Sequence, residues 1–239
     1  MTNTGIGAQQ PELSRPEHQN TAASSVPYVL PFAVFMALLA LQSALHLDDW
    51  FDLVLRTVLL IGALALSRQV LTFQTTRMLG SLFMGAGVFL VWIAPDVLFP
   101  HYRSFWLFQN GVLGTATSTL PGFMRQNTLA LGLRSFRAII LVPIVEELFW
   151  RGWLMRWLID HRFERVRLGA FTASSFWITA LLFASEHGPY WDVGLAAGIA
   201  YNWWMVRTKS IGDCVLAHAV TNALLSAYVI AGGHWQYWM

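Results

Sequence analysis

Charged residues are scarce in this chain. Asp, Glu, Lys and Arg make up 12% of its 239 residues, while hydrophobic residues make up 56%. Soluble domains average about 25% charged residues, so the composition excludes an ordinary soluble domain and indicates an integral membrane protein. The net charge is only +2 and no Lys- or Arg-rich tract occurs, so we expect no nucleic-acid partner.

Several familiar catalytic signatures are also missing. The single cysteine, Cys214, excludes an internal disulfide and, within an apolar run, predicts a small packed side chain. The chain contains no His-Glu-x-x-His zinc helix and no Gly-x-Ser-x-Gly nucleophile elbow. Asp192 and Asp213 begin consecutive apolar runs, but residues 210–213 lack the first glycine of the aspartyl-protease Gly-x-Gly-Asp pattern. We interpret both aspartates as helix N-terminal residues that the helix dipole favours.

Long apolar runs predict an all-α fold, a polytopic membrane helix bundle. A helix needs about 20 apolar residues to cross a bilayer. Glycines at 80, 85 and 87 and the pair Gly194 and Gly198 predict close contacts between helices. We expect about seven transmembrane helices, at residues 28–47, 51–67, 78–99, 133–159, 171–187, 191–206 and 211–231.

The remaining segments are polar. Residues 1–27 have no apolar signal-peptide core, and we expect a disordered cytoplasmic tail there, followed by a membrane domain at residues 28–239. Residues 100–134 are rich in Gly, Thr, Ser, Pro and Asn, which predicts an extramembrane or re-entrant segment, or else an eighth crossing. The positions of Lys and Arg predict an N-terminus inside and a C-terminus outside. No sequence feature fixes the oligomeric state.

Two adjacent carboxylates and an arginine lie within the fourth apolar run. A charge at this depth costs at least ~2.5–3.5 kcal/mol on insertion scales and is rarely without a function. Glu147 and Arg151 are four residues apart, so they share a helix face and can neutralise each other. Glu146 points about 100° further round the helix and has no such partner. The spacing therefore predicts a structural Glu147–Arg151 ion pair and a reactive Glu146.

Pro143 lies three residues before Glu146. A proline inside a helix has no N–H, so in an α-helix it leaves the carbonyl of Ile139 without a donor and bends the chain. A bend at this point is a plausible way to open a wet cavity beside the carboxylate.

Two further polar patterns occur at helical spacing. Phe183 and His187 end the fifth run, and His218 and Asn222 lie one turn apart in the seventh. Either pattern alone is typical of hydrogen bonding between helices. Three polar sites on three apolar helices, in a chain with so little charge, favour chemistry or metal binding.

These residue types support hydrolysis by either of two mechanisms. A glutamate with a histidine can position and deprotonate a water, while a second histidine with an asparagine amide can stabilise an oxyanion. Alternatively, Glu146, His187 and His218 could ligate a divalent ion, with zinc as the expected metal and water in the fourth position. The spacing does not separate these mechanisms. We expect Glu186, beside His187, to face the membrane interface.

Together the three patterns resemble the signature of a known family. The type II CAAX prenyl endopeptidases and bacteriocin-processing intramembrane proteases, the CPBP or Abi family, carry Glu-Glu-x-x-x-Arg, Phe-x-x-x-His and His-x-x-x-Asn in this order on separate helices. Here the patterns stand at residues 146–151, 183–187 and 218–222. The resemblance covers about residues 130–231, the expected protease-like core. The layout also looks like the CAAX-protease-related proteins found beside exosortase systems in Gram-negative bacteria.

The resemblance implies an intramembrane endopeptidase, either a metallo- or a glutamic protease, whose substrate is a membrane-associated protein or peptide. In the eukaryotic and archaeal branch, the last three residues of a prenylated C-terminal CaaX are removed. The expected location is the bacterial inner membrane. Six residues take roles by resemblance: Glu146 and His187 activate water, His218 and Asn222 form the oxyanion site, and Glu147 with Arg151 supports the helix.

Two other functions use the same residues. A non-catalytic immunity or scaffold protein of the same fold would keep them as a network that fixes helix register. A transporter or proton relay also places Glu and His in a membrane, but the inverted repeats and paired broken helices that favour it are not evident in the sequence.

Overall fold

The computed structural model describes residues 21–42 and 47–238. Across these ranges the protein is an all-α bundle of membrane type, without a β-strand. The expected fold class is therefore confirmed. The helices outside the fourth apolar run are α1 (Thr21–Gln42), α2 (Asp49–Leu66), α3 (Met78–Leu98), α7 (Ala173–Ser185), α8 (Trp191–Thr208) and α9 (Ile211–Gly232).

A helix of 30 residues, Thr128–Trp157, occupies the fourth apolar run, and we call it the central helix. It consists of α4 (Thr128–Phe136), a π-helical turn at Arg137–Leu141, α5 (Val142–Glu147), a second π-helical turn at Leu148–Leu154 and α6 (Met155–Trp157). Asn127 caps its start, because the side-chain carbonyl accepts from the N–H groups of Leu129 and Ala130. The helix therefore begins five residues before the expected position.

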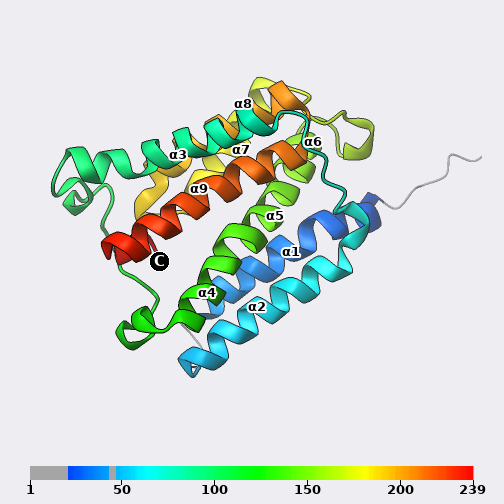
Figure 1. Ribbon diagram of the computed structural model, residues 1–239. Helices are drawn as coiled ribbons and strands as arrows, with labels where there is room; N and C mark the ends of the chain where they lie inside the picture. The colour runs from blue at the N-terminus through cyan, green and yellow to red at the C-terminus, as the bar shows by residue number, and fades with distance from the viewer. Residues whose placement is uncertain (1–20, 43–46, 239) are drawn as a thin grey trace, which may run out of the picture.

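The central helix lies between two groups of helices. Figure 1 shows α1 and α2 side by side on one flank and α9, backed by α3, on the other, while α7 and α8 pair behind α9. The residues of the three expected polar sites are carried by the central helix, the end of α7 and the middle of α9.

Within residues 21–42 and 47–238, three helices are long and apolar enough to cross a membrane: α3, the central helix and α9. Shorter apolar helices lie at Ser25–Leu41 and Ala173–Ser185. Large apolar side chains such as Phe83 and Leu79 point outward and are 78% and 72% exposed, as expected for a surface that faces lipid. The number of seven crossings stays a prediction.

The first helix begins earlier than expected. Helix α1 begins at Thr21, so residues 21–27 are helical and the polar tail, as far as the chain is described, ends earlier than expected. Pro27 and Pro31 both lie within α1. Residues 1–20, the rest of the expected tail, lie outside the described residues.

The glycines explain part of the packing. A Cβ on Gly85 would lie 2.3 Å from the carbonyl oxygen of Ala217, so α3 and α9 approach more closely there than a side chain permits. A Cβ on Gly198 would meet the backbone of Ala180 on α7 at 3.2 Å. Gly87 has nothing within 4 Å, so its expected part in helix packing is wrong.

Residues 99–127 form an irregular segment with two short 3₁₀ turns, tied to the end of the bundle. The guanidinium of Arg103 forms ion pairs with Asp96 and Asp192, and Tyr237 donates a hydrogen bond to Asp96 at 2.8 Å. Burial, and the negative charge of Asp192, raise the pKa of Tyr102, whose hydroxyl donates to that aspartate. This cluster fastens the segment to α3, α8 and the C-terminal residues.

Candidate active site

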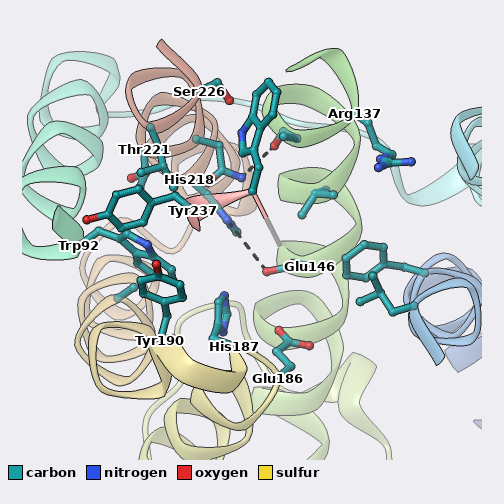
Figure 2. A pocket seen from close by; sticks show the side chains of 18 of the residues that line it. Trp92, Arg137, Glu146, Glu186, His187, Tyr190, His218, Thr221, Ser226 and Tyr237 are labelled. Carbon is teal, nitrogen blue, oxygen red and sulfur yellow. Dashed lines mark hydrogen bonds and ion pairs between the residues drawn. The ribbon is translucent and has the colours of Figure 1, made fainter. Parts of the chain in front are cut away.

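A cavity of about 330 Å³ lies between the central helix and the neighbouring helices, with lining residues from α1, α2, α3, α7, α8 and α9. Four of the six residues expected at the site line it: Glu146, His187, His218 and Asn222. Figure 2 shows the side chains of Glu146, His187 and His218 pointing into this space. Glu147 and Arg151 lie behind the wall of the cavity and are fully buried.

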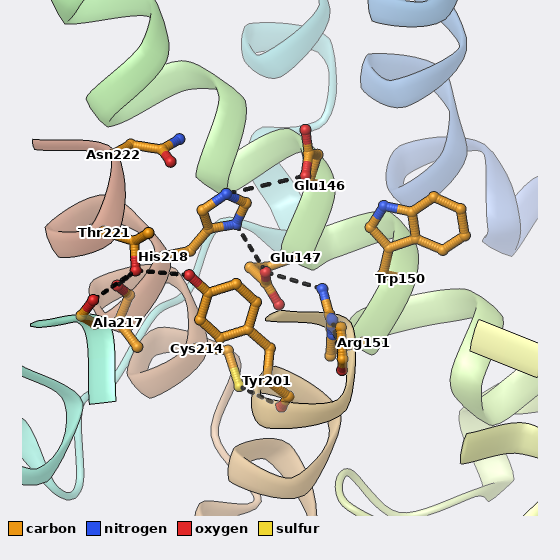
Figure 3. A network of polar contacts seen from close by, with 12 residues as sticks. Glu146, Glu147, Trp150, Arg151, Tyr201, Cys214, Ala217, His218, Thr221 and Asn222 are labelled. Atoms are coloured by element: carbon orange, nitrogen blue, oxygen red, sulfur yellow. Dashed lines mark hydrogen bonds and ion pairs between the residues drawn. The ribbon is translucent and has the colours of Figure 1, made fainter. Parts of the chain in front are cut away.

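Glu147 and Arg151 form the expected ion pair, with 3.0 Å between Nη1 and Oε1. The Nε–H of Arg151 donates to Asn202 at 2.9 Å, and its Nη2 donates to the carbonyl of Gly198 at 3.3 Å. Its guanidinium also lies 4.7 Å from the ring centre of Phe183. The pair therefore connects the central helix to α7 and α8, and Figure 3 shows it next to His218, with Glu147 between the histidine and Arg151.

His218 lies between the two carboxylates. Its Nδ1 is 3.0 Å from Oε1 of Glu147, and its Nε2 is 4.0 Å from Oε2 of Glu146. Since Glu147 is ion-paired and accepts, Nδ1 carries a proton, which turns Nε2 toward the cavity and Glu146. The ring of Tyr201 stacks on the imidazole at 5.0 Å, and the Tyr201 hydroxyl donates to Thr221 at 2.7 Å. The orientation of His218 is thus held from two sides.

Glu146 itself has little support. The residue is 5% exposed, and its buried Oε2 has no hydrogen-bond partner among the described residues. The separation of 4.0 Å from His218 is too long for a hydrogen bond. Adjacent positions on one helix thus place one carboxylate in a network and leave the other facing a cavity.

His187 is fixed by the backbone. Its Nδ1 is 2.7 Å from the carbonyl oxygen of Phe183, so Nδ1 carries the proton and the lone pair of Nε2 is free for another group. A Cβ on Gly194 would lie 3.1 Å from the imidazole ring. Gly194, which the sequence indicated only as a helix-packing residue, therefore makes room for this histidine.

Asn222 compensates for the proline. Because residues 137–141 form a π-helical turn, the N–H of Val142 donates to the carbonyl of Arg137, five residues back. The next donor in that register would be Pro143, which has no N–H, so the carbonyl of Ala138 lacks its helical donor. Asn222 donates to that carbonyl from Nδ2 at 2.8 Å. The expectation of a free carbonyl at Ile139 assumed α-helical register, whereas the π-helical turn shifts the missing donor to Ala138.

Glu186 also belongs to the cavity. It lines the space beside Glu146 and His187, and its Oε1 accepts a hydrogen bond from the indole N–H of Trp150 at 3.1 Å. The expectation that Glu186 faces the membrane interface is therefore wrong. A carboxylate next to a candidate catalytic histidine was the available signal, and Glu186 is the residue that ends α7. Tyr201 was missed as well, since an aromatic residue in an apolar helix carries no signal of its own.

The other carboxylates expected at helix starts do not form a dyad. Asp213, near the start of α9, accepts hydrogen bonds from Thr76, Arg77 and Ser81 at the start of α3. Asp192 lies at the opposite end of α8 from the turn that leads into α9, and it pairs with Arg103. Each aspartate thus supports the packing of a separate end of the bundle.

No three His, Cys, Asp or Glu side chains within the described ranges lie close enough together to hold a metal ion. The expected zinc set of Glu146, His187 and His218 lines the same cavity, but these groups are not placed as a ligand set, and the Nδ1 of His218 is taken up by Glu147. A zinc ion therefore stays a prediction.

A family model described as type II CAAX prenyl endopeptidase Rce1-like matches residues 128–224. This range begins with the central helix and contains all three polar patterns. Neither a curated protein nor a solved structure matches the chain. The family match supports a likeness of these residues to intramembrane proteases of CAAX type. The match over residues 128–224 thus confirms the resemblance to the CAAX protease (CPBP) family.

Proposed function

We propose that this protein is an intramembrane endopeptidase in which Glu146 deprotonates the attacking water. One observation carries the proposal: a buried carboxylate that has no hydrogen-bond partner among the described residues faces a cavity that two histidines and an asparagine also line. The same proposal includes a location in the bacterial inner membrane, with the N-terminus on the cytoplasmic side.

His187 positions the water. Because its Nδ1–H donates to the carbonyl of Phe183, its Nε2 can accept one hydrogen of a water in the cavity. Glu146 takes the other hydrogen as a proton, and the hydroxide attacks the peptide carbonyl. The protonated Glu146 then supplies this proton to the leaving amine, so that the carboxylate is regenerated.

The oxyanion of the tetrahedral intermediate accepts hydrogen bonds from His218 and Asn222. His218 donates from Nε2 when its ring is protonated on both nitrogens, with the ionised Glu147 at 3.0 Å balancing the charge. The amide of Asn222 has two N–H groups, of which one is used on Ala138 and one remains. No step of this mechanism passes through a metal.

The proposal is tested by comparing the termini of membrane proteins in cells that contain wild-type protein or Glu146→Gln at equal abundance. We expect new termini only with the wild type, and those termini identify the substrate. The alternative of a non-catalytic immunity or scaffold protein gains support if the termini are the same and the cellular phenotype survives the substitution.

A second measurement addresses the metal. Purified protein is treated with a chelator, and cleavage of the substrate identified above is followed before and after treatment. The metal-free mechanism predicts an unchanged rate and no stoichiometric zinc by elemental analysis. A loss of activity that zinc restores would require the Glu146, His187 and His218 ligand set instead.

A further inference from the structure

The candidate active-site cavity carries opposite charges in two regions. Glu146 and Glu186 line one region, and three arginines line another: Arg56, Arg134 and Arg137. The rest of the lining is largely apolar, with side chains such as Phe35, Leu38 and Val142. The proposed reaction uses the carboxylate region only, so the arginines require a separate explanation.

Two of these arginines are engaged by the protein. The Nε–H of Arg56 donates to Asp52 at 2.6 Å, and its Nη1 donates to the carbonyl of Leu38 at 2.7 Å. The Nη2 of Arg134 donates to the hydroxyl of Thr119 at 3.0 Å. Both guanidiniums therefore have structural partners.

Arg137 is different. The residue is 8% exposed, and its guanidinium makes no hydrogen bond or ion pair with the described residues. The charged groups on the elements packed against it are Arg134 on its own helix and Asp52 and Arg56 on α2, and Asp52 is already paired. A buried guanidinium without a partner is costly, and its planar fork matches the two oxygens of a carboxylate. The structure thus holds a donor group that lacks its acceptor.

The spacing along the central helix limits what this acceptor can be. Arg137 and Glu146 are nine residues apart on one helix, which corresponds to at most about 14 Å at the α-helical rise of 1.5 Å per residue, since a π-helical turn lies between them. An extended peptide covers roughly 3.3–3.6 Å per residue, so three residues span about 10 Å. A peptide bond at Glu146 and a carboxylate at Arg137 can therefore belong to one short C-terminal segment, with the reach of the arginine side chain covering the remainder.

We propose that Arg137 binds the C-terminal α-carboxylate of the substrate and so directs cleavage to a bond a few residues from a free C-terminus. The inference rests on the proposed protease function for its substrate class. Arg137 is a specificity-determining residue that touches the end of the peptide, distant from the bond that breaks.

The experiment measures binding in the Glu146→Gln background, in which the proposed mechanism leaves the probe intact. The probes are two fluorescent peptides, each an S-farnesyl cysteine followed by three aliphatic residues, one ending in a carboxylate and the other in a carboxamide. In nanodiscs of uncharged lipid, we expect the acid to bind about 10- to 100-fold more tightly than the amide, as for a hydrogen bond to a charged group. Adding Arg137→Gln brings this ratio close to 1, and Arg137→Lys retains part of it. The matched control is Arg162→Gln, an arginine in an exposed loop, which keeps the full ratio.

Three results would overturn the inference. The first is an acid-to-amide affinity ratio near 1 before Arg137 is changed. The second is an equal loss of affinity for both peptides in Arg137→Gln, which would indicate a structural residue. The third is competition by added phosphatidylglycerol against both peptides alike, which would assign the guanidinium to a lipid phosphate. Thermal unfolding of each variant shows whether the bundle is intact.

The same probes separate this inference from the proposed function. If otherwise wild-type protein cleaves the acid and the amide equally well, the carboxylate site is refuted while the protease remains. If the acid binds through Arg137 but no probe is cleaved and no cellular termini change, the carboxylate site remains while the protease is refuted.

Discussion

Arg151 and Arg137 lie fourteen residues apart on the central helix, and both are more than nine-tenths buried. Arg151 donates to Glu147, Asn202 and Gly198, whereas Arg137 has no partner among the described residues. Equal burial therefore accompanies two different roles. The arginine with a complete set of partners holds helices together, and the arginine without one faces a cavity where a ligand can supply the partner.

The two adjacent glutamates repeat this contrast. Oε1 of Glu147 accepts from both Arg151 and His218, and only its Oε2 has no hydrogen-bond partner among the described residues. Glu146 makes no hydrogen bond with these residues, and its Oε2 lies 4.0 Å from Nε2 of His218. A helix rotates by about 100° per residue, which is enough to direct one carboxylate into the packed interior and the other into the cavity. The predictions below test whether the satisfied side is structural and the unsatisfied side functional.

The largest effect is expected from Glu146→Gln. Loss of a general base lowers kcat by about 10²–10⁴-fold. Because Glu146 makes no hydrogen bond with the described residues, the unfolding temperature stays near that of the wild type. Cleavage assays and thermal unfolding in detergent measure the two quantities. The contrast fails if Glu146→Gln unfolds the protein or retains full activity.

Arg151→Met should instead destabilise the protein by about 3–5 kcal/mol, because it leaves the buried Glu147 charge without its partner. The double variant Glu147→Gln with Arg151→Met should recover part of this loss, since no unpaired charge remains. Arg137→Met is the matched control on the same helix, and we expect it to be neutral or stabilising. Unfolding by denaturant gives all three values, and equal losses for Arg151→Met and Arg137→Met would refute the distinction.

Asn222→Leu should cost about 1–3 kcal/mol, because it leaves the carbonyl of Ala138 buried without a donor. Pro143→Ala restores a backbone N–H at the position that faces this carbonyl. The penalty of Asn222→Leu should therefore shrink when Pro143→Ala is already present. A double-mutant cycle measures the coupling, and additive effects would show that the asparagine does not replace the missing donor.

The smallest effect is expected at the surface. Asp160 and Arg162 are 4.0 Å apart with side chains 44% and 57% exposed. Exposed ion pairs contribute about 0–1 kcal/mol, so Arg162→Gln should leave the free energy of unfolding nearly unchanged. A loss comparable to that of Arg151→Met would mean that charge pairing, and not burial with complete hydrogen bonding, determines stability here.

Much of the fold was predictable because apolar run length determines where helices form in a chain of this kind. The ends of α3 and α9 lie within one residue of the expected positions. The start of the central helix was not predicted, because the cap at Asn127 lies in a segment whose polar composition indicated a loop. Such a cap is a local hydrogen-bonding event, and hydropathy does not report it.

The candidate site was predictable to the extent that helical spacing determines it. Spacing of four residues gave the Glu147–Arg151 pair, but it could not show that His218 contacts both glutamates, since that depends on how α9 packs against the central helix. The π-helical turn before Pro143 was also beyond reach, because a sequence does not show a change of register. Glu186 was misplaced for a related reason: whether the residue that ends α7 faces the cavity depends on how the helices pack.

The contacts of α9 with the central helix have a mechanical consequence. Proline removes the hydrogen bond that would join the turns on either side of it, so residues before and after Pro143 could shift against each other. Helix α9 contacts both sides, since Asn222 donates to the carbonyl of Ala138 before Pro143 and His218 forms a hydrogen bond with Glu147 after it. Helix α9 therefore bridges the missing hydrogen bond. The distance between the two ends of the cavity depends on α9, and not only on the continuity of the central helix.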